Sequence, residues 1–242
     1  MNPLFSMREN KPLHQFDQIA RTVRKVFLPR FGEARTDELI RQTRKEFEAI
    51  IPLLPDIGAK KVFSDFLLFT GMYLAMYRVL KKEGMQVEEM GNLIWEIGVT
   101  YVRSVPKFIP RLMGGMNFSK RYLEKLEQRA AESRQRKYAG DYVYDFIPGD
   151  GVNFDYGVDY VECASHKFLQ AQRAGELTRF ICPMDILYSQ TLGWGLKRTT
   201  TLAEGGQRCD FRFQQGGKTQ VAVPRSLQLY WEKEKHNRLF EM

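Results

Sequence analysis

The sequence predicts an α+β protein in which a helical N-terminal half packs on a small antiparallel sheet with helices of its own. Apolar residues recur at helical spacing through the first 140 residues. The pattern changes at Gly140, after which Val152 to Cys163 alternates between apolar and polar residues as a half-buried strand does. The expected strands are few and close together in sequence, which argues against a doubly wound parallel sheet.

Five helices are expected before Gly140, separated by turn-forming residues. Their expected ranges are 14–27, 36–54, 60–83, 87–103 and 117 or 119 to 138. Thr36 can N-cap the second helix, because its hydroxyl can accept a hydrogen bond from a free N–H of the first turn. Gly84 can end the third helix as its C-cap. Pro106 and Pro110 break up the chain between the fourth and fifth helices.

Beyond Gly140 the chain is expected to alternate between strands and short helices. Strands are predicted over 142–147, 152–163, 195–202 and 207–213, the last two as a hairpin. Residues 164–188 are predicted to be helical, with interruptions at Gly175 and Pro183. Gly157 is interpreted as a bulge in its strand. We therefore divide the chain into a helical region (1–140), an α+β core (141–215) and a C-terminal extension (216–242), expected to form one integrated domain.

The chain carries a net charge of +8, and part of that excess lies between Lys120 and Lys137. Few aromatic residues accompany this cluster, which favours a solvated helix face over a nucleic-acid-binding stripe. The most apolar stretch, residues 62–80, contains Asp65 and Arg78, which favours a buried core helix over a membrane span. The first residues lack the apolar segment of a secretory signal. We therefore expect a cytoplasmic protein without nucleic-acid or membrane partners, and homo-oligomerisation is compatible with the sequence.

The stretch Cys182-Pro183-Met184-Asp185 combines a thiol and a carboxylate at an expected helix start. Proline suits the first helical position, which makes Cys182 a candidate N-cap. There the positive end of the helix dipole would lower the thiol pKa and stabilise a thiolate. Asp185 disfavours a second negative charge, so it suits a base or proton carrier. The alternative is that Cys182 is a small buried residue at a helix break and that Asp185 only caps the helix.

The predicted hairpin supplies a cation and further polar side chains. Strand alternation puts Arg198 and Thr200 on one face of the first strand and separates Cys209 from Asp210 in the second. Arg198 could bind a substrate carboxylate, although pairing inside the protein with Asp210 or Glu204 is favoured. We take Arg198, Thr200, Cys209 and Asp210 as candidate substrate-binding residues.

Two other groups of residues are weaker candidates for ligand binding. Cys163 and His166 form a C-x-x-H pair, but no second close-spaced pair completes a zinc site. The sequence has none of the common nucleotide-binding or metalloprotease motifs either, so neither a metal nor a cofactor is expected. Met72, Tyr73 and Met76 are expected in the core, and the alternative is that they line a small-molecule cavity.

The spacing of these residues resembles the signature of the L-2-amino-thiazoline-4-carboxylic acid hydrolase family. The residues that carry the resemblance are Cys163, Glu176-Leu177, Cys182-x-x-Asp185 and Leu196-x-Arg198-x-x-Thr201-Leu202-x-x-Gly205-x-x-x-Cys209-Asp210-Phe211. The specific part covers residues 161–213. Residues 63–138 are similar in helical character to the family's N-terminal part, whereas the first fifty residues and the tail lie outside the resemblance.

The resemblance implies a hydrolase that opens a small cyclic amidine of the thiazoline type. Water adds at the amidine carbon and the C–S bond breaks, which gives an N-carbamoyl cysteine. The resemblance suggests Cys182 or Cys163 as nucleophile or acid, Asp185 as base and Arg198 as carboxylate clamp. The same stretch is also similar to 4-vinyl-reductase-like domains, and this implies, as the alternative, a non-catalytic small-molecule-binding or scaffold module.

Overall fold

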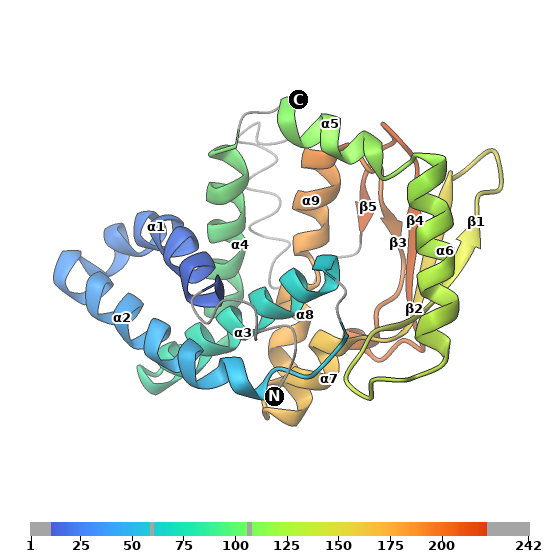
Figure 1. The fold of residues 1–242 in the computed structure, drawn as a ribbon. Coiled ribbons are helices and arrows are strands. Elements are labelled where there is room, and N and C mark those ends of the chain that lie inside the picture. The colour runs from blue at the N-terminus through green and yellow to red at the C-terminus, as the bar shows by residue number, and fades with distance from the viewer. Residues whose placement is uncertain (1–10, 59–60, 106–107, 222–242) are drawn as a thin grey trace. The chain divides into compact units, whose positions relative to one another are not determined.

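The computed structural model describes residues 11–58, 61–105 and 108–221, and it confirms the α+β fold (Figure 1). The chain divides into two compact units that interleave along the sequence. The first unit comprises residues 1–101, 138–141 and 164–181, and the second comprises residues 102–137, 142–163 and 182–242. Every residue proposed above for catalysis or substrate binding belongs to the second unit.

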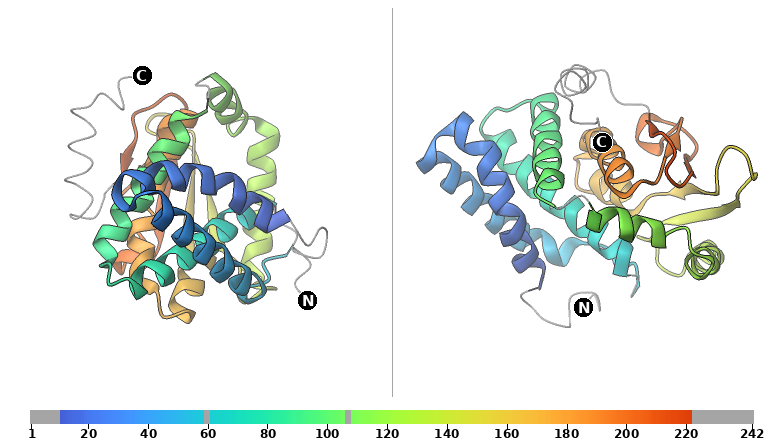
Figure 2. Two further views of the ribbon diagram at one scale, coloured as in Figure 1. Left: turned by 90° about the vertical axis from the view of Figure 1, so that its left-hand side faces the viewer. Right: turned by 90° about the horizontal axis from the view of Figure 1, so that it is seen from above.

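The first unit is built from helices. Its elements are α1 (Lys11–Phe31), α2 (Glu33–Ile50), a 3-10 turn (Ile51–Leu53), α3 (Lys61–Lys82), most of α4 (Val87–Arg103), α7 (Ala164–Ala171), a second 3-10 turn (Gly175–Leu177) and α8 (Thr178–Ile181). Helices α1 and α2 lie side by side (Figure 2), with the rings of Phe16 and Phe47 stacked at 5.7 Å. Leu67 and Leu74 of α3 are fully buried, which confirms α3 as a core helix. Within the described residues, no helix is both long and apolar enough to cross a membrane.

Glycine residues, and not capping side chains, mark two of the helix boundaries in this unit. Gly84 ends α3 with a φ of 85°, in the left-handed region, which confirms the predicted C-cap. Gly32 separates α1 from α2 with a φ of 73° and occupies the N-cap position of α2. Thr36 therefore lies inside the helix, fully buried, and its prediction as an N-cap is wrong.

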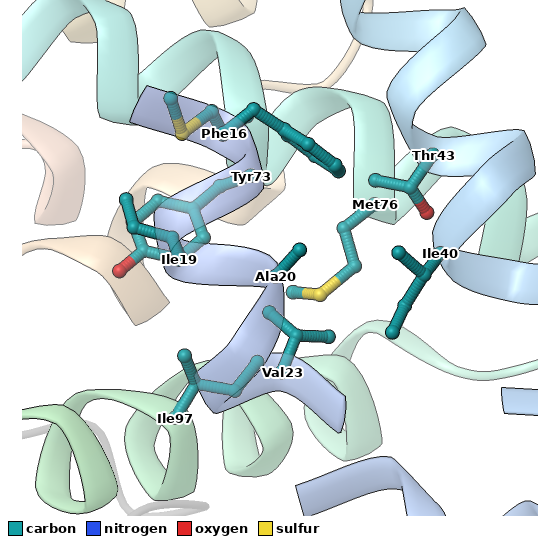
Figure 3. A pocket seen from close by; sticks show the side chains of 10 residues that line it. Phe16, Ile19, Ala20, Val23, Ile40, Thr43, Tyr73, Met76 and Ile97 are labelled. Atoms are coloured by element: carbon teal, nitrogen blue, oxygen red, sulfur yellow. The ribbon is translucent and has the colours of Figure 1, made fainter. Parts of the chain in front are cut away.

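A small apolar hollow lies among the helices of the first unit (Figure 3). The residues that line it are Phe16, Ile19, Ala20, Val23, Ile40, Thr43, Met72, Tyr73, Met76 and Ile97. The Thr43 hydroxyl donates a hydrogen bond to Leu39 O within its own helix. Burial raises the pKa of Tyr73 to about 12, so its phenol stays protonated near neutral pH. The cavity volume is about 30 Å³, well below the roughly 300–1,000 Å³ of a typical ligand pocket. Met72, Tyr73 and Met76 thus line a hollow, but one too small for a substrate.

The second unit contains a mixed sheet. Its strands are β1 (Val143–Pro148), β2 (Tyr156–Glu162), β3 (Lys197–Arg198), β4 (Cys209–Phe213) and β5 (Gln220–Val221), in the order β1-β2-β4-β3-β5. Its helices are α5 (Phe108–Met116), α6 (Lys120–Arg134) and α9 (Met184–Leu192). The strand pairs are antiparallel except β3 and β5, which run parallel. The prediction of a purely antiparallel sheet is therefore wrong at this one edge.

The strand register brings several candidate residues to one face of the sheet. Tyr160 of β2 pairs directly with Cys209 of β4. Lys197 of β3 pairs with Arg212 of β4. Because alternate residues of a strand share a face, Arg198 lies on the face opposite Arg212, together with Cys209 and Tyr160.

Gly157 does not form the predicted bulge. The irregularity in register lies between Val143 and Tyr144 of β1 instead. At Gly157, an added Cβ would lie 2.8 Å from Cδ of Arg212 on the neighbouring strand. The absence of a side chain therefore makes room for the arginine stem on this face.

The predicted hairpin is also shorter than expected, because the chain leaves the sheet after Arg198. The backbone N–H groups of Thr199 and Thr200 donate to Oδ1 of Asp210 at 2.9 and 2.7 Å. These bonds replace the strand pairing that the sequence predicts for this segment. The connection to β4 then contains a 3-10 turn, Leu202–Glu204.

Helix α5 is not predicted by the sequence, because Pro110 reads as a break. The proline lies in the first turn of the helix, where a missing N–H leaves no bond unmade. Gly114 packs against the end of α9, and an added Cβ would lie 1.9 Å from Leu192 O. The neighbouring Gly115 has more room, since its nearest contact is a side-chain nitrogen of Gln215 at 3.4 Å.

Gly114→Ala is expected to destabilise the protein by about 1–3 kcal/mol, because the backbone of α9 cannot move aside as a side chain can. Gly115→Ala is the matched control on the same helix. It is expected to be neutral or to stabilise by about 0.5–1 kcal/mol, since alanine favours helix over glycine. Urea unfolding of both variants measures the difference. Equal free energies of unfolding for the two would contradict the close packing of α5 on α9.

Candidate functional site

The centre of the site is an ion pair between Arg198 and Asp185. Nη1 of Arg198 donates to Oδ2 of Asp185 at 2.5 Å and to the carbonyl oxygen of Cys182 at 3.3 Å. The Arg198 side chain is 2% exposed and that of Asp185 is 28% exposed. The sequence favoured an internal partner for Arg198, but it named Asp210 or Glu204, and the partner is Asp185. The pair is thus anchored on its cationic side and reachable by solvent on its anionic side.

The start of α9 positions Asp185. Pro183 is the N-cap of this helix, so Asp185 lies in the first turn and Cys182 lies one residue before the cap. The prediction that Cys182 is the N-cap is therefore wrong. The Cys182 carbonyl instead accepts a hydrogen bond from the N–H of Asp185 at 3.3 Å. The same carbonyl binds Arg198, which ties β3 to the beginning of α9.

None of the three cysteines forms a disulfide, and they belong to one electrostatic environment. Burial raises the pKa of Cys182 well above its ordinary value, Arg198 opposes the rise, and the neighbouring Cys163, Asp185 and Cys209 add to it. Burial also raises the pKa of Cys209, whose sulfur accepts a hydrogen bond from Leu202 N–H at 3.2 Å. The expected low-pKa thiolate at Cys182 is therefore not supported, and this sulfur stays protonated near neutral pH.

The carboxyl group of Asp185 combines burial with a cationic neighbour. Burial raises its pKa, and the charge and hydrogen bond of Arg198 limit the rise. The ion pair uses Oδ2 of Asp185, and within the described residues Oδ1 accepts no hydrogen bond. The guanidinium likewise donates to described residues only through Nη1. One carboxylate oxygen and several guanidinium N–H groups thus have no hydrogen-bond partner among the described residues, and the carboxylate side of the pair is the more exposed.

Two aromatic residues complete the site, and the sequence reasoning did not select either of them. Arg198 lies over the ring of Phe211, with Cζ 5.3 Å from the ring centroid. Tyr160 meets the same ring edge-on at 5.3 Å. Burial raises the pKa of Tyr160 well above its ordinary value, and the charge of Asp185 contributes. The sequence feature that could have revealed them is the alternation of side chains along β2 and β4, which places both rings on the same face as Arg198.

Asp210 and Thr200, expected to bind substrate, are occupied with the loop after β3. Besides the two backbone N–H groups, Asp210 accepts the Thr199 hydroxyl at 2.6 Å. Burial works against ionisation of Asp210, but these hydrogen bonds together lower its pKa. The bonds hold the chain immediately after Arg198 and so help to orient the guanidinium.

The structure also locates the residues considered for metal binding. In the part of the chain that is described, no three His, Cys, Asp or Glu side chains gather in a way that could hold a metal ion. Nδ1 of His166 lies 3.2 Å from the Thr178 hydroxyl, and Nε2 lies 3.0 Å from the Gln170 amide. Both contacts are within the first unit, where His166 links α7 to α8.

The chain belongs to the L-2-amino-thiazoline-4-carboxylic acid hydrolase family, whose model matches residues 65–213. The match begins in α3 and ends with the last residue of β4. It includes Asp185, Arg198, Phe211, Tyr160 and all three cysteines. No curated protein and no solved structure matches the chain.

Cys182 is expected to alkylate more slowly at about pH 8 than an unperturbed thiol, whose pKa is about 8.5. Its raised pKa leaves a smaller thiolate fraction, and the thiolate is the species that reacts. Iodoacetamide labelling across a pH series, read peptide by peptide by mass spectrometry, measures this. The chain unfolded in urea serves as the control, since its three cysteines should label alike. Fast labelling of native Cys182 at about pH 7 would restore the thiolate interpretation.

Proposed function

We propose that this protein hydrolyses a small cyclic amidine of the 2-aminothiazoline-4-carboxylate type. The observation that carries the proposal is the pair formed by buried Arg198 and partly exposed Asp185, with free hydrogen-bonding groups on both sides. A substrate of this type carries a carboxylate and an amidine, which are the complements of a guanidinium and a carboxylate. The family to which the chain belongs is named for a hydrolase of such a compound.

Asp185 is proposed to act as the base and then as the acid of the reaction. It takes a proton from water as the oxygen adds to the amidine carbon. The new hydroxyl then gives its proton to the ring nitrogen and becomes the carbonyl as the C–S bond breaks. Asp185 returns its own proton to the departing sulfur, which leaves an N-carbamoyl thiol. Burial supports both roles, because a carboxyl with a raised pKa accepts a proton more readily than an ordinary aspartate.

The three thiols are assigned a supporting role in place of nucleophilic attack. Cys182 stays protonated because burial raises its pKa, so its S–H can donate a weak hydrogen bond near Asp185. This assignment replaces the nucleophile that the resemblance suggested for Cys182 or Cys163. Phe211 and Tyr160 offer flat apolar surface to a planar ring.

Asp185→Asn is expected to lower kcat for 2-aminothiazoline-4-carboxylate at least about 100-fold, because an amide cannot accept the proton from water. Cys182→Ser is expected to lower kcat less than about tenfold, since a hydroxyl keeps a hydrogen-bond donor in place. N-Carbamoyl cysteine formation, followed by mass spectrometry, gives both rates. Thermal unfolding of each variant checks that the fold is retained.

Asp145→Asn is the matched control, because it makes the same substitution on β1, where Asp145 pairs with Arg134. Its turnover should equal that of the unmodified protein. Loss of turnover in Cys182→Ser with a folded chain would reinstate the nucleophilic cysteine. Binding of the compound by calorimetry without any turnover would contradict the hydrolase and favour the non-catalytic binding module.

A further inference from the structure

Helix α5 exposes three of its large apolar side chains. Its buried positions include Pro110 and Gly114, and Gly114 lies directly against the backbone of Leu192. Leu112, Met113 and Met116 are 75%, 58% and 65% exposed. An amphipathic helix of a globular protein normally buries such residues and exposes small or polar ones.

These three side chains form one continuous stripe, which we call the α5 stripe. Successive residues of a helix are rotated by about 100°, so positions 112, 113 and 116 fall within one third of the helix circumference. Gly114 falls on the opposite side. The packing of Gly114 therefore fixes the direction in which the stripe points, which is away from α9. Grouped apolar residues on a surface mark an interaction site more often than scattered ones do.

Exposed cations follow the α5 stripe. The helix α6 begins directly after the turn that ends α5, and it opens with exposed Lys120 and Arg121. The Lys120 side chain is 92% exposed, and it lies 4.0 Å from Glu124, at the limit of an ion pair. The stripe is thus followed by basic residues, an arrangement that favours an anionic interface.

We propose that the α5 stripe docks on an anionic lipid surface, with its apolar side chains in the headgroup region and its cations on lipid phosphates. A second copy of the chain fits less well. Three side chains of one short helix fall far short of the roughly 800 Å² per partner that a stable dimer buries. A two-fold contact would also place Lys120 and Arg121 close to the same cations of the other copy.

The expectation of no membrane partner considered only helices that span a membrane. This proposal replaces it with docking of the protein on a membrane surface. The expectation rested on the charges within residues 62–80, and those residues lie in core helix α3. The proposal does not depend on the hydrolase assignment, because no residue of the α5 stripe belongs to the Arg198 site. Failure of one therefore leaves the other standing.

The test is sedimentation of the full chain with vesicles of phosphatidylcholine alone or mixed with phosphatidylglycerol. Binding is expected only to the mixed vesicles and should fall as NaCl rises from about 0.05 to about 0.5 M, because the Debye length shortens. Leu112→Ser combined with Met116→Ser should lower the partition coefficient at least about tenfold. Arg121→Gln should lower it more weakly and should reduce its dependence on salt.

Val152→Ser is the matched control, because Val152 is 77% exposed in the same unit but far from the α5 stripe in sequence. It should bind vesicles as the unmodified chain does. All variants should unfold at the same temperature, since the substituted side chains are exposed. Equal binding to both vesicle types, or unchanged binding of the double variant, would overturn the proposal. So would a dimer seen by analytical ultracentrifugation that the double variant abolishes while vesicle binding is absent.

Discussion

The second unit depends on keeping one buried guanidinium satisfied. Arg198 is 2% exposed, and a cation so placed is strongly unfavourable without a partner. Asp185 supplies the opposite charge, the Cys182 carbonyl supplies a further acceptor, and Phe211 supplies a π face. Asp185 and Cys182 come from the start of α9 and Phe211 comes from β4, so this side chain of β3 links the three segments. The residues available to a ligand are the ones that this arrangement leaves unsatisfied.

The raised pKa of Cys182 shows that burial outweighs the effect of a helix dipole on a thiol. A dipole contributes about 0.3–1 kcal/mol, and at most about 2 kcal/mol, at a favourable terminus. Burial raises the pKa of Cys182 well above its ordinary value, although the residue is only half-buried. Cys182 also lies one residue before the cap, where the dipole is weaker. Burial therefore outweighs the dipole, and the proposed reaction assigns the acid–base role to the partly exposed carboxyl group of Asp185.

The sequence predicted local features well and long-range partners poorly. Its local signals located α3 and α4, the glycine cap at Gly84 and the helix break at Pro183. It also selected Asp185 and Arg198 as members of one site, without joining them. The ion pair between Arg198 and Asp185 could not be predicted from sequence spacing. Asp210 lies in the predicted hairpin with Arg198, but it accepts hydrogen bonds from the backbone N–H groups of Thr199 and Thr200. Which acceptor is free depends on where the chain leaves the sheet, and this is a tertiary property.

Two further differences between the prediction and the structure involve glycine, at Gly157 and at Gly114. A single sequence reads glycine as a turn or a bulge, because these are the positions where its backbone freedom is needed. At Gly157 and Gly114 the requirement is space, for the Arg212 stem in one case and for the α9 backbone in the other. Gly114 brings one side of α5 directly against the α9 backbone, and the exposed leucine and methionines lie on the other side. Close backbone packing on α9 therefore sets the direction of the apolar surface on which the lipid-docking proposal rests.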